Sequence, residues 1–233
     1  MSLLLERGQR GLLVGQTGSG KTQNALWQLR NTPVWPVMVF DTKIEPEFLT
    51  LATGDEKIEL VEGIDEYRSL SRRKRDDRPD YAVVRPTLDE MGDPDLMDEY
   101  VRLSYDKFGA GLFYFDEVYN WHNRGVAGNG LIGLLTRGRS KGKTVLMATQ
   151  RPSWISRFCI TESQKFYLHW LADSRDKKTL AEVVPMFDRL PDVPRHHFYH
   201  YSTTDHRTAP KLYSPVPQHV ADRTKAHRAM GWL

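Results

Sequence analysis

Residues 15–22 read GQTGSGKT, in which three glycines precede a lysine and a threonine. Glycine permits tight turns and close approach, so that successive N–H groups can converge on an anion. The spacing fits G-x-x-x-x-G-K-[ST], where the lysine reaches the β and γ phosphates of a nucleotide and the hydroxyl meets a bridging Mg²⁺. The predicted nucleotide-binding residues are Gly15, Gln16, Thr17, Gly18, Ser19, Gly20, Lys21 and Thr22. We therefore expect a nucleoside triphosphate here, with Thr22 on the metal.

Two carboxylates follow an apolar run at residues 112–117, which read LFYFDE. This pattern predicts a buried strand whose carboxyl end presents Asp116 and Glu117, at the edge of a parallel sheet where ligands bind. Asp116 then suits the Mg²⁺ shell, directly or through a water, and Glu117 suits a base that orients and polarises an attacking water. The alternative is a strand that ends in two solvated acids.

A third polar side chain ends the apolar run in KTVLMATQRP, residues 143–152. Gln150 would stand beside the γ phosphate, where it could donate to that phosphate or hold the attacking water. The alternative is that Gln150 is a turn residue ahead of Pro152.

These side chains need a sheet that brings several strand ends together. Short apolar runs alternate with segments of helical period, which predicts βαβ units and a mostly parallel sheet flanked by helices. The expected strands are 11–14, 36–40, 57–61, 81–85, 111–115, 143–149 and 166–171. The expected helices are 21–29, 96–108, 131–139 and 175–184. Residues 1–185 then form an α/β core, and residues 186–233 a small C-terminal extension of strands and loops with a short basic helix at 221–230.

Size and composition are those of a folded, soluble chain. Its 233 residues, 39% hydrophobic and 27% charged, fit one sizeable domain. No apolar run approaches the ~20 residues that span a bilayer, and Cys159 is the single cysteine, so we expect a cytoplasmic protein. The net charge of +3 permits nucleic-acid contact without requiring it. His196, His197, His200 and His206 lack the spacing of a metal site and are expected on an exposed strand and turn.

The motifs TGSGKT, FDE and ATQRP, each at a predicted strand end, together resemble those of the FtsK/HerA superfamily of ring-forming, DNA-pumping ATPases. VFDTK at 39–43 is also similar to a strand end in that group, and the likeness spans about residues 8–155. Compact members include viral and phage genome-packaging ATPases. The resemblance implies a RecA-like (ASCE) P-loop fold, with an additional strand between the phosphate-loop strand and the acidic strand, and a homo-oligomeric ring. The resemblance also implies that Asp116 assists Mg²⁺, that Glu117 activates water and that Gln150 senses the γ phosphate.

Rings of this kind need an arginine from the neighbouring subunit to stabilise charge on the transferred phosphoryl group. The segment TRGRSKGK, residues 136–143, offers Arg139 first and Arg137 second. A solvated basic helix end explains the same charges. Arg151 and Arg124 remain open as alternatives.

Contact with DNA is harder to locate. The densest basic run, Arg72 to Arg75, is followed at once by two aspartates and is typical of a solvated loop. Residues 119–130, YNWHNRGVAGNG, have the glycines, aromatics and arginine of a pore loop that grips a DNA backbone, or of a loop between subunits.

The sequence thus favours an ATP- and Mg²⁺-dependent ATPase that translocates double-stranded DNA, without sequence preference, into a preformed viral capsid. We expect a ring of identical subunits, a capsid-vertex or membrane protein as docking partner, and a place in the host cytoplasm or virion. One alternative is the zonula-occludens-toxin-like assembly ATPase of filamentous phages, which usually carries a membrane helix. A second is a small-molecule P-loop kinase with Arg72 to Arg78 as its lid. A third is a nucleotide-dependent switch without motor activity.

Overall fold

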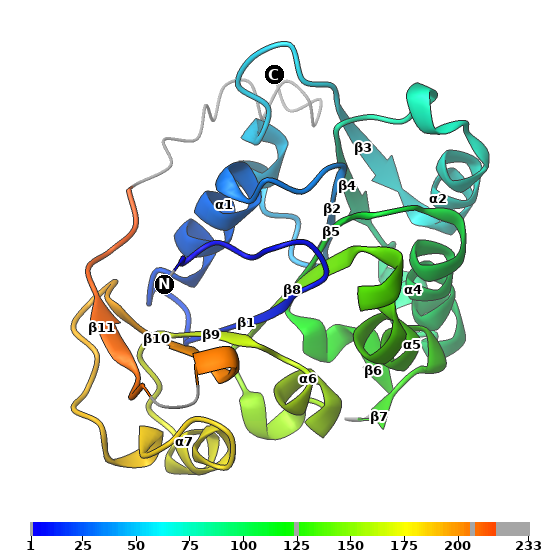
Figure 1. The fold of residues 1–233 in the computed structure, drawn as a ribbon. Coiled ribbons are helices and arrows are strands. Elements are labelled where there is room, and N and C mark those ends of the chain that lie inside the picture. Colours follow the sequence, from blue (N-terminus) through cyan, green and yellow to red (C-terminus); the bar gives the residue numbers. More distant parts are fainter. Residues whose placement is uncertain (1, 124–125, 206–207, 218–233) are drawn as a thin grey trace.

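The computed structural model describes residues 2–123, 126–205 and 208–217, which contain a nine-stranded sheet and a two-stranded hairpin (Figure 1). The sheet order is β11-β10-β9-β1-β8-β5-β2-β4-β3. Its strands are β1 (Arg10–Val14), β2 (Val37–Asp41), β3 (Ile58–Glu62), β4 (Tyr81–Arg85), β5 (Gly111–Asp116), β8 (Lys143–Thr149), β9 (Lys165–Leu168), β10 (Phe198–Ser202) and β11 (Lys211–Tyr213). The strands from β3 to β9 in this order pair in parallel, whereas β10 and β11 pair antiparallel. The sheet is therefore mostly parallel, as predicted.

Helices cover both faces of the sheet (Figure 1). They are α1 (Lys21–Asn31), α2 (Gly63–Arg72), α3 (Leu88–Met91), α4 (Pro94–Lys107), α5 (Asn129–Arg137), α6 (Arg157–Thr161) and α7 (Ser174–Ala181). Successive strand residues face opposite ways, so Leu12 joins a core under α2, α4 and α5, whereas Leu13 joins a second core under α1. Burial on both faces explains the near-continuous apolar runs of these strands.

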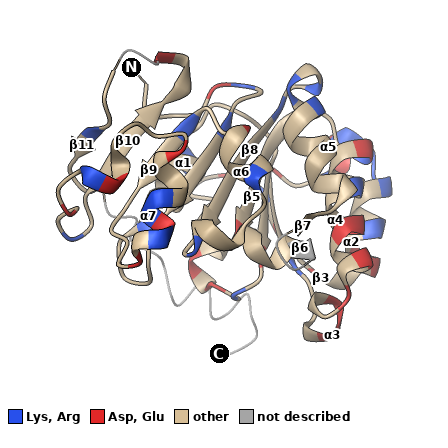
Figure 2. Cartoon of the chain, turned by 90° about the horizontal axis from the view of Figure 1, so that it is seen from below, with Lys and Arg blue, Asp and Glu red and all other residues tan. Residues whose placement is uncertain are grey.

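The strand β8 lies between β1 and β5. This confirms the additional strand between the phosphate-loop strand and the acidic strand. The helix α2 was missed by the sequence analysis because its charges dominate the segment. Its apolar positions Ile64, Tyr67 and Leu70 nevertheless recur every three residues and are buried. Figure 2 shows basic and acidic residues interspersed along α2 and α4.

The chain beyond residue 185 adds β10 and β11 to one edge of the sheet. His200 on β10 is 3% exposed and packs between the rings of Tyr167 and Tyr213, so the expected exposure of this histidine was wrong. The cause is that His200 lies between two paired strands, β9 and β11, whose tyrosine rings pack against its imidazole. The helix expected at 221–230 lies outside the described residues, and the domain boundary at 185 stays a prediction.

None of the helices in the described part of the chain is long and apolar enough to cross a membrane. The longest, α4, has 14 residues and carries six charged side chains.

Candidate active site

The glycine-rich loop joins the carboxyl end of β1 to the first turn of α1. Gly18 and Gly20 have φ angles of 77° and 97°, in the region that favours glycine. A Cβ atom on Gly15 would lie 2.5 Å from Ser19 Oγ and 2.6 Å from His169 Cβ, so that only glycine fits there. The loop thus wraps tightly around the N-terminus of α1, whose free N–H groups attract phosphate.

His169 supports this loop from the end of β9. The imidazole is 1% exposed and its Nδ1 lies 3.1 Å from the carbonyl oxygen of Ser19, so Nδ1 carries the hydrogen and donates. Nε2 then accepts from Asn24 Nδ2 at 3.2 Å. Burial lowers the pKa of His169 to about 4. The ring therefore stays neutral at physiological pH and holds one tautomer against the loop.

Asp116 ends β5, two strands away from β1 in the sheet order. It is 2% exposed, and its Oδ1 accepts a hydrogen bond from the hydroxyl of Tyr114 at 2.9 Å. Its Oδ2 is buried and accepts no hydrogen bond from the described residues; the nearest ammonium, Lys43 Nζ, is 3.7 Å away. An anionic oxygen left in this state suits a divalent cation or a water bound to one.

Glu117 follows Asp116 with a φ angle of 55°, which turns its side chain toward the end of β8. Its Oε1 accepts from Thr149 Oγ1 and from the backbone N–H of Gln150, both at 3.1 Å. Its Oε2 lies 3.1 Å from Lys43 Nζ and 3.9 Å from Lys21 Nζ. Burial alone would raise the pKa of Glu117, but the two ammonium groups and the hydrogen bonds outweigh it and the pKa is lowered.

Lys43 lies in the VFDTK segment, and its role was not predicted from the sequence. A buried ion pair shapes its loop, with Arg85 Nε 2.9 Å from Asp41 Oδ2. Asp41 Oδ1 accepts from the Lys43 backbone N–H, and Arg85 Nη2 donates to the carbonyl of Glu45. The aspartate in this segment therefore holds the loop and leaves the lysine to face the acidic strand end.

Gln150 lies beside the phosphate loop, where its Oε1 accepts a hydrogen bond from Thr17 Oγ1 at 3.0 Å. A cavity of about 490 Å³ opens at this point. It is lined by Gln16, Thr17, Gly18, Gly20, Lys21, Thr22, Gln23, Lys43, Glu45, Gln150 and His196. The structure thus brings the carboxyl ends of β1, β5 and β8 together on one side of the sheet, around a space large enough for a nucleotide.

Arg137 and Arg139 lie near the amino ends of the strands, opposite the strand ends that surround the cavity. Both are exposed and precede the amino end of β8, whose seven residues span about 23 Å. Neither side chain can reach the nucleotide cavity of its own chain. Arg124 lies outside the described residues.

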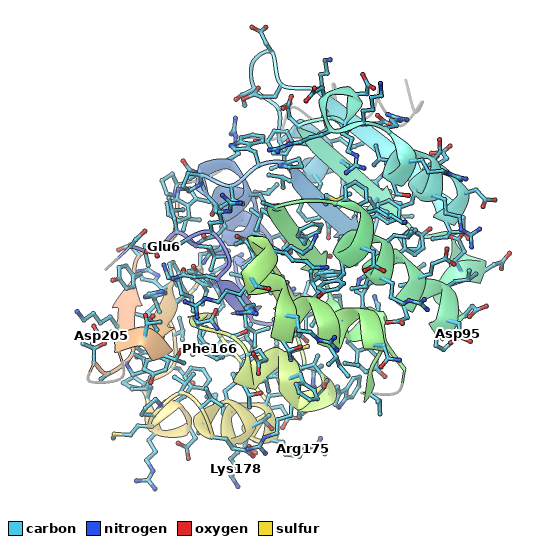
Figure 3. All side chains as sticks on the ribbon, turned by 45° about the vertical axis from the view of Figure 1, so that its right-hand side comes forward. Glu6, Asp95, Phe166, Arg175, Lys178 and Asp205 are labelled. Atoms are coloured by element: carbon cyan, nitrogen blue, oxygen red, sulfur yellow. The ribbon has the colours of Figure 1, made fainter. Side chains whose placement is uncertain are left out.

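Arg151 is held by two carboxylates of the α7 region, with Nη2 2.8 Å from Asp173 Oδ2 and Nε 2.9 Å from Asp176 Oδ2. Its guanidinium also stacks over the ring of Trp154. Figure 3 shows Arg175 and Lys178 pointing outward from the same helix, whereas Asp176 is fully buried. Among the described residues, Arg151 therefore takes part in a local ion-pair network.

The basic run after α2 leads to the amino end of β4, at the edge of the sheet away from the nucleotide cavity. Arg73 pairs with Glu59 at 2.6 Å, and Arg78 donates to the carbonyls of Arg73, Ser71 and Lys107. These arginines cannot close over the cavity as a kinase lid would.

Residues 119–130 fold in part into the hairpin of β6 (His122–Asn123) and β7 (Val126–Ala127). Trp121, just before it, is 3% exposed and contacts the rings of Phe40 and Phe115. One end of the hairpin is thus anchored in the core close to the end of β5.

A phosphate loop between β1 and α1, an acidic end on β5 and an inserted β8 define a RecA-like P-loop ATPase. The chain is 30% identical over 235 residues to the DNA packaging ATPase P9 of Enterobacteria phage PRD1, which covers 96% of this chain and 93% of that protein. The chain therefore belongs to this family of phage DNA packaging ATPases.

Solved structures show the same fold. The genome packaging NTPase B204 of Sulfolobus turreted icosahedral virus 2, in complex with AMPPCP, has a TM-score of 0.66 at 14% identity and covers 90% of this chain and 99% of that one. VirB4 of Thermoanaerobacter pseudethanolicus has a TM-score of 0.62 at 10% identity, over 92% of this chain and 90% of that one. No protein-family model matches the sequence.

Proposed function

We propose that this chain hydrolyses ATP to move double-stranded DNA into a viral capsid, as a ring of identical subunits. The family of phage packaging ATPases supports the packaging role. The observation that carries the hydrolytic step is the position of Glu117, whose carboxylate accepts from the backbone N–H of Gln150 while Gln150 itself bonds the phosphate loop. A carboxylate base and a side-chain amide beside the phosphates are suited to transfer of the γ phosphoryl group to water.

The binding roles follow from the cavity. The N–H groups of the loop and Lys21 hold the β and γ phosphates, and Thr22 offers its hydroxyl to Mg²⁺. Asp116 fits the same ion, because its Oδ2 is buried and accepts no hydrogen bond from the described residues. When bound, Mg²⁺ would neutralise the charge that develops on the phosphate oxygens.

In the chemical step Glu117 accepts a proton from the attacking water. The water oxygen bonds to the γ phosphorus as the bond to the bridging oxygen of ADP breaks, which yields ADP and phosphate. Gln150 orients the water or the γ phosphate and loses that contact after release. Its bond to Thr17 passes the change to the phosphate loop.

We assign the charge-stabilising arginine to the neighbouring subunit, with Arg139 before Arg137. Both lie near the amino ends of the strands, on the side of the sheet opposite the nucleotide cavity. They would face another copy in a ring that stacks this side of one subunit on the next subunit. A C-terminal contact with a capsid-vertex or membrane protein would place the ring in the host cytoplasm or on the virion. The filamentous-phage and kinase alternatives are not favoured, since the family match is to a packaging ATPase and the basic run is remote from the cavity.

The proposal is tested by ATP turnover with and without duplex DNA, beside a Glu117→Gln variant. We expect slow basal turnover, stimulation by DNA of any sequence, and a variant that binds ATP but turns over about 10²–10⁴ times more slowly. Turnover that depends on a small metabolite and is indifferent to DNA would contradict it.

A further inference from the structure

A second cavity adjoins the nucleotide cavity at the start of α1. It has a volume of about 200 Å³ and is lined by Gly20, Gln23, His196, Pro215 and Val216. Three of these residues, Gly20, Gln23 and His196, also line the nucleotide cavity. The two spaces therefore meet along the last glycine of the phosphate loop and the first turn of α1.

His196 lies at this junction, in a tight turn that packs against the phosphate loop. Its φ angle of 63° lies in the left-handed region, which a non-glycine residue rarely adopts. A Cβ atom on Gly20 would lie 3.2 Å from His196 Nδ1 and 3.3 Å from His196 Cα, so that the histidine rests directly on the loop glycine. The turn is closed by the His197 N–H, which donates to the carbonyl of Pro194 at 3.0 Å.

The smaller cavity continues from the proposed phosphate site. In that site the phosphates would reach Thr22, and Gln23, the next residue of α1, lines the second cavity. The nucleoside would therefore leave the loop on the side of this cavity. An imidazole ring and two apolar side chains, Pro215 and Val216, form the walls there. Such surfaces match the flat, weakly polar face of a nucleobase.

We propose that this cavity binds the purine base of ATP, with His196 stacked on one face and Pro215 and Val216 against the other. The inference rests on the proposed ATP site and extends it to the base. The proposal also assigns a function to the segment beyond residue 185, because His196 precedes β10 and Val216 follows β11. Base recognition thus comes from the far end of the chain.

Inorganic tripolyphosphate separates the base from the phosphates, because it carries three phosphates and no base. We expect His196→Ala in the full chain to weaken ATP binding about tenfold and to leave tripolyphosphate binding unchanged, both measured by calorimetry with Mg²⁺. His196→Phe keeps a stacking ring and should restore ATP binding to within about twofold of the wild type. His197→Ala is the matched control, since the Nδ1 of that residue faces the carbonyl of Arg195 instead.

Three results would overturn the inference alone: an equal loss for both ligands in His196→Ala, no loss for either, or wild-type binding of ATP no tighter than that of tripolyphosphate. The first would show that His196 only supports the loop. If the wild type bound neither ligand, the proposed ATP site would fail as well.

Discussion

Lys43 Nζ lies 3.1 Å from Glu117 Oε2, which joins the loop after β2 to the residue after β5. The two strands are neighbours in the sheet, and Asp41 pairs in register with Asp116, so the side chains two and one residues further on meet across the strand ends. Lys43 and Lys21 together hold the carboxylate of Glu117 in its charged form.

Removal of the Lys43 charge should therefore raise the pKa of Glu117. A base acts in its deprotonated form, so the acid limb of the pH profile of kcat/KM should move to higher pH in Lys43→Gln. Lys43→Arg keeps the charge and should leave that limb in place. An acid limb at the same pH in both variants would show that Lys43 does not act on the base.

Arg139 is expected to act on the site of the neighbouring subunit. Arg139→Ala and Lys21→Ala should each abolish DNA-stimulated turnover when present alone. Mixed rings would contain interfaces with an intact cavity on one side and an intact Arg139 on the other, so that mixing should restore roughly a quarter of wild-type turnover. If mixing restores nothing while the rings still exchange subunits, Arg139 does not act in trans, and the same pair of experiments with Arg137→Ala is next.

Two buried histidines predict how stability depends on pH. Burial lowers the pKa of both His169 and His200 to about 4. The unfolded chain takes up these protons near pH 6.5 and the folded chain does not, so the stability is fully present above pH 6.5 and is lost as the pH falls toward 4.

The loss at His169 is expected to be about 2 kcal/mol at pH 5 and about 3 kcal/mol at pH 4. Urea midpoints at pH 7 and pH 5 measure the effect, and His200→Phe should reduce the difference between them. Equal midpoints for the wild type at both pH values would contradict these pKa values.

Gly15 should tolerate no side chain. Gly15→Ala would drive a Cβ atom against Ser19 and His169, and we expect at least a tenfold loss of ATP affinity, or about 1.4 kcal/mol. Gly133→Ala is the control, because an added Cβ there meets nothing within 4 Å and alanine favours α5 by up to about 1 kcal/mol. ATP titrations and urea midpoints of the two variants decide the matter, and normal ATP binding by Gly15→Ala would refute the close fit.

The strand ends could be predicted because each is a local pattern. An apolar run followed by a polar residue identifies Asp116, Glu117 and Gln150, and parallel strands bring such ends to one edge. Their shared edge is confirmed by the register of β5 with β8.

The supporting contacts could not be predicted in the same way. Lys43 meets Glu117 only because β2 pairs with β5, and His169 meets Ser19 only because β9 pairs with β1. These pairings link positions far apart in the sequence, and the single chain carries no local signal for them. His196 is the extreme case, since it reaches Gly20 from a turn 176 positions later.

We propose above all that ATP hydrolysis at Glu117 moves duplex DNA. The most direct test is displacement of a third strand from a duplex, followed by fluorescence, with wild type and Glu117→Gln in ATP and Mg²⁺. We predict that the wild type releases the third strand after a delay that grows with its distance from the loading end, and that the variant binds ATP but releases none. Release by the variant at the wild-type rate, or wild-type ATP turnover without any release, would contradict the account.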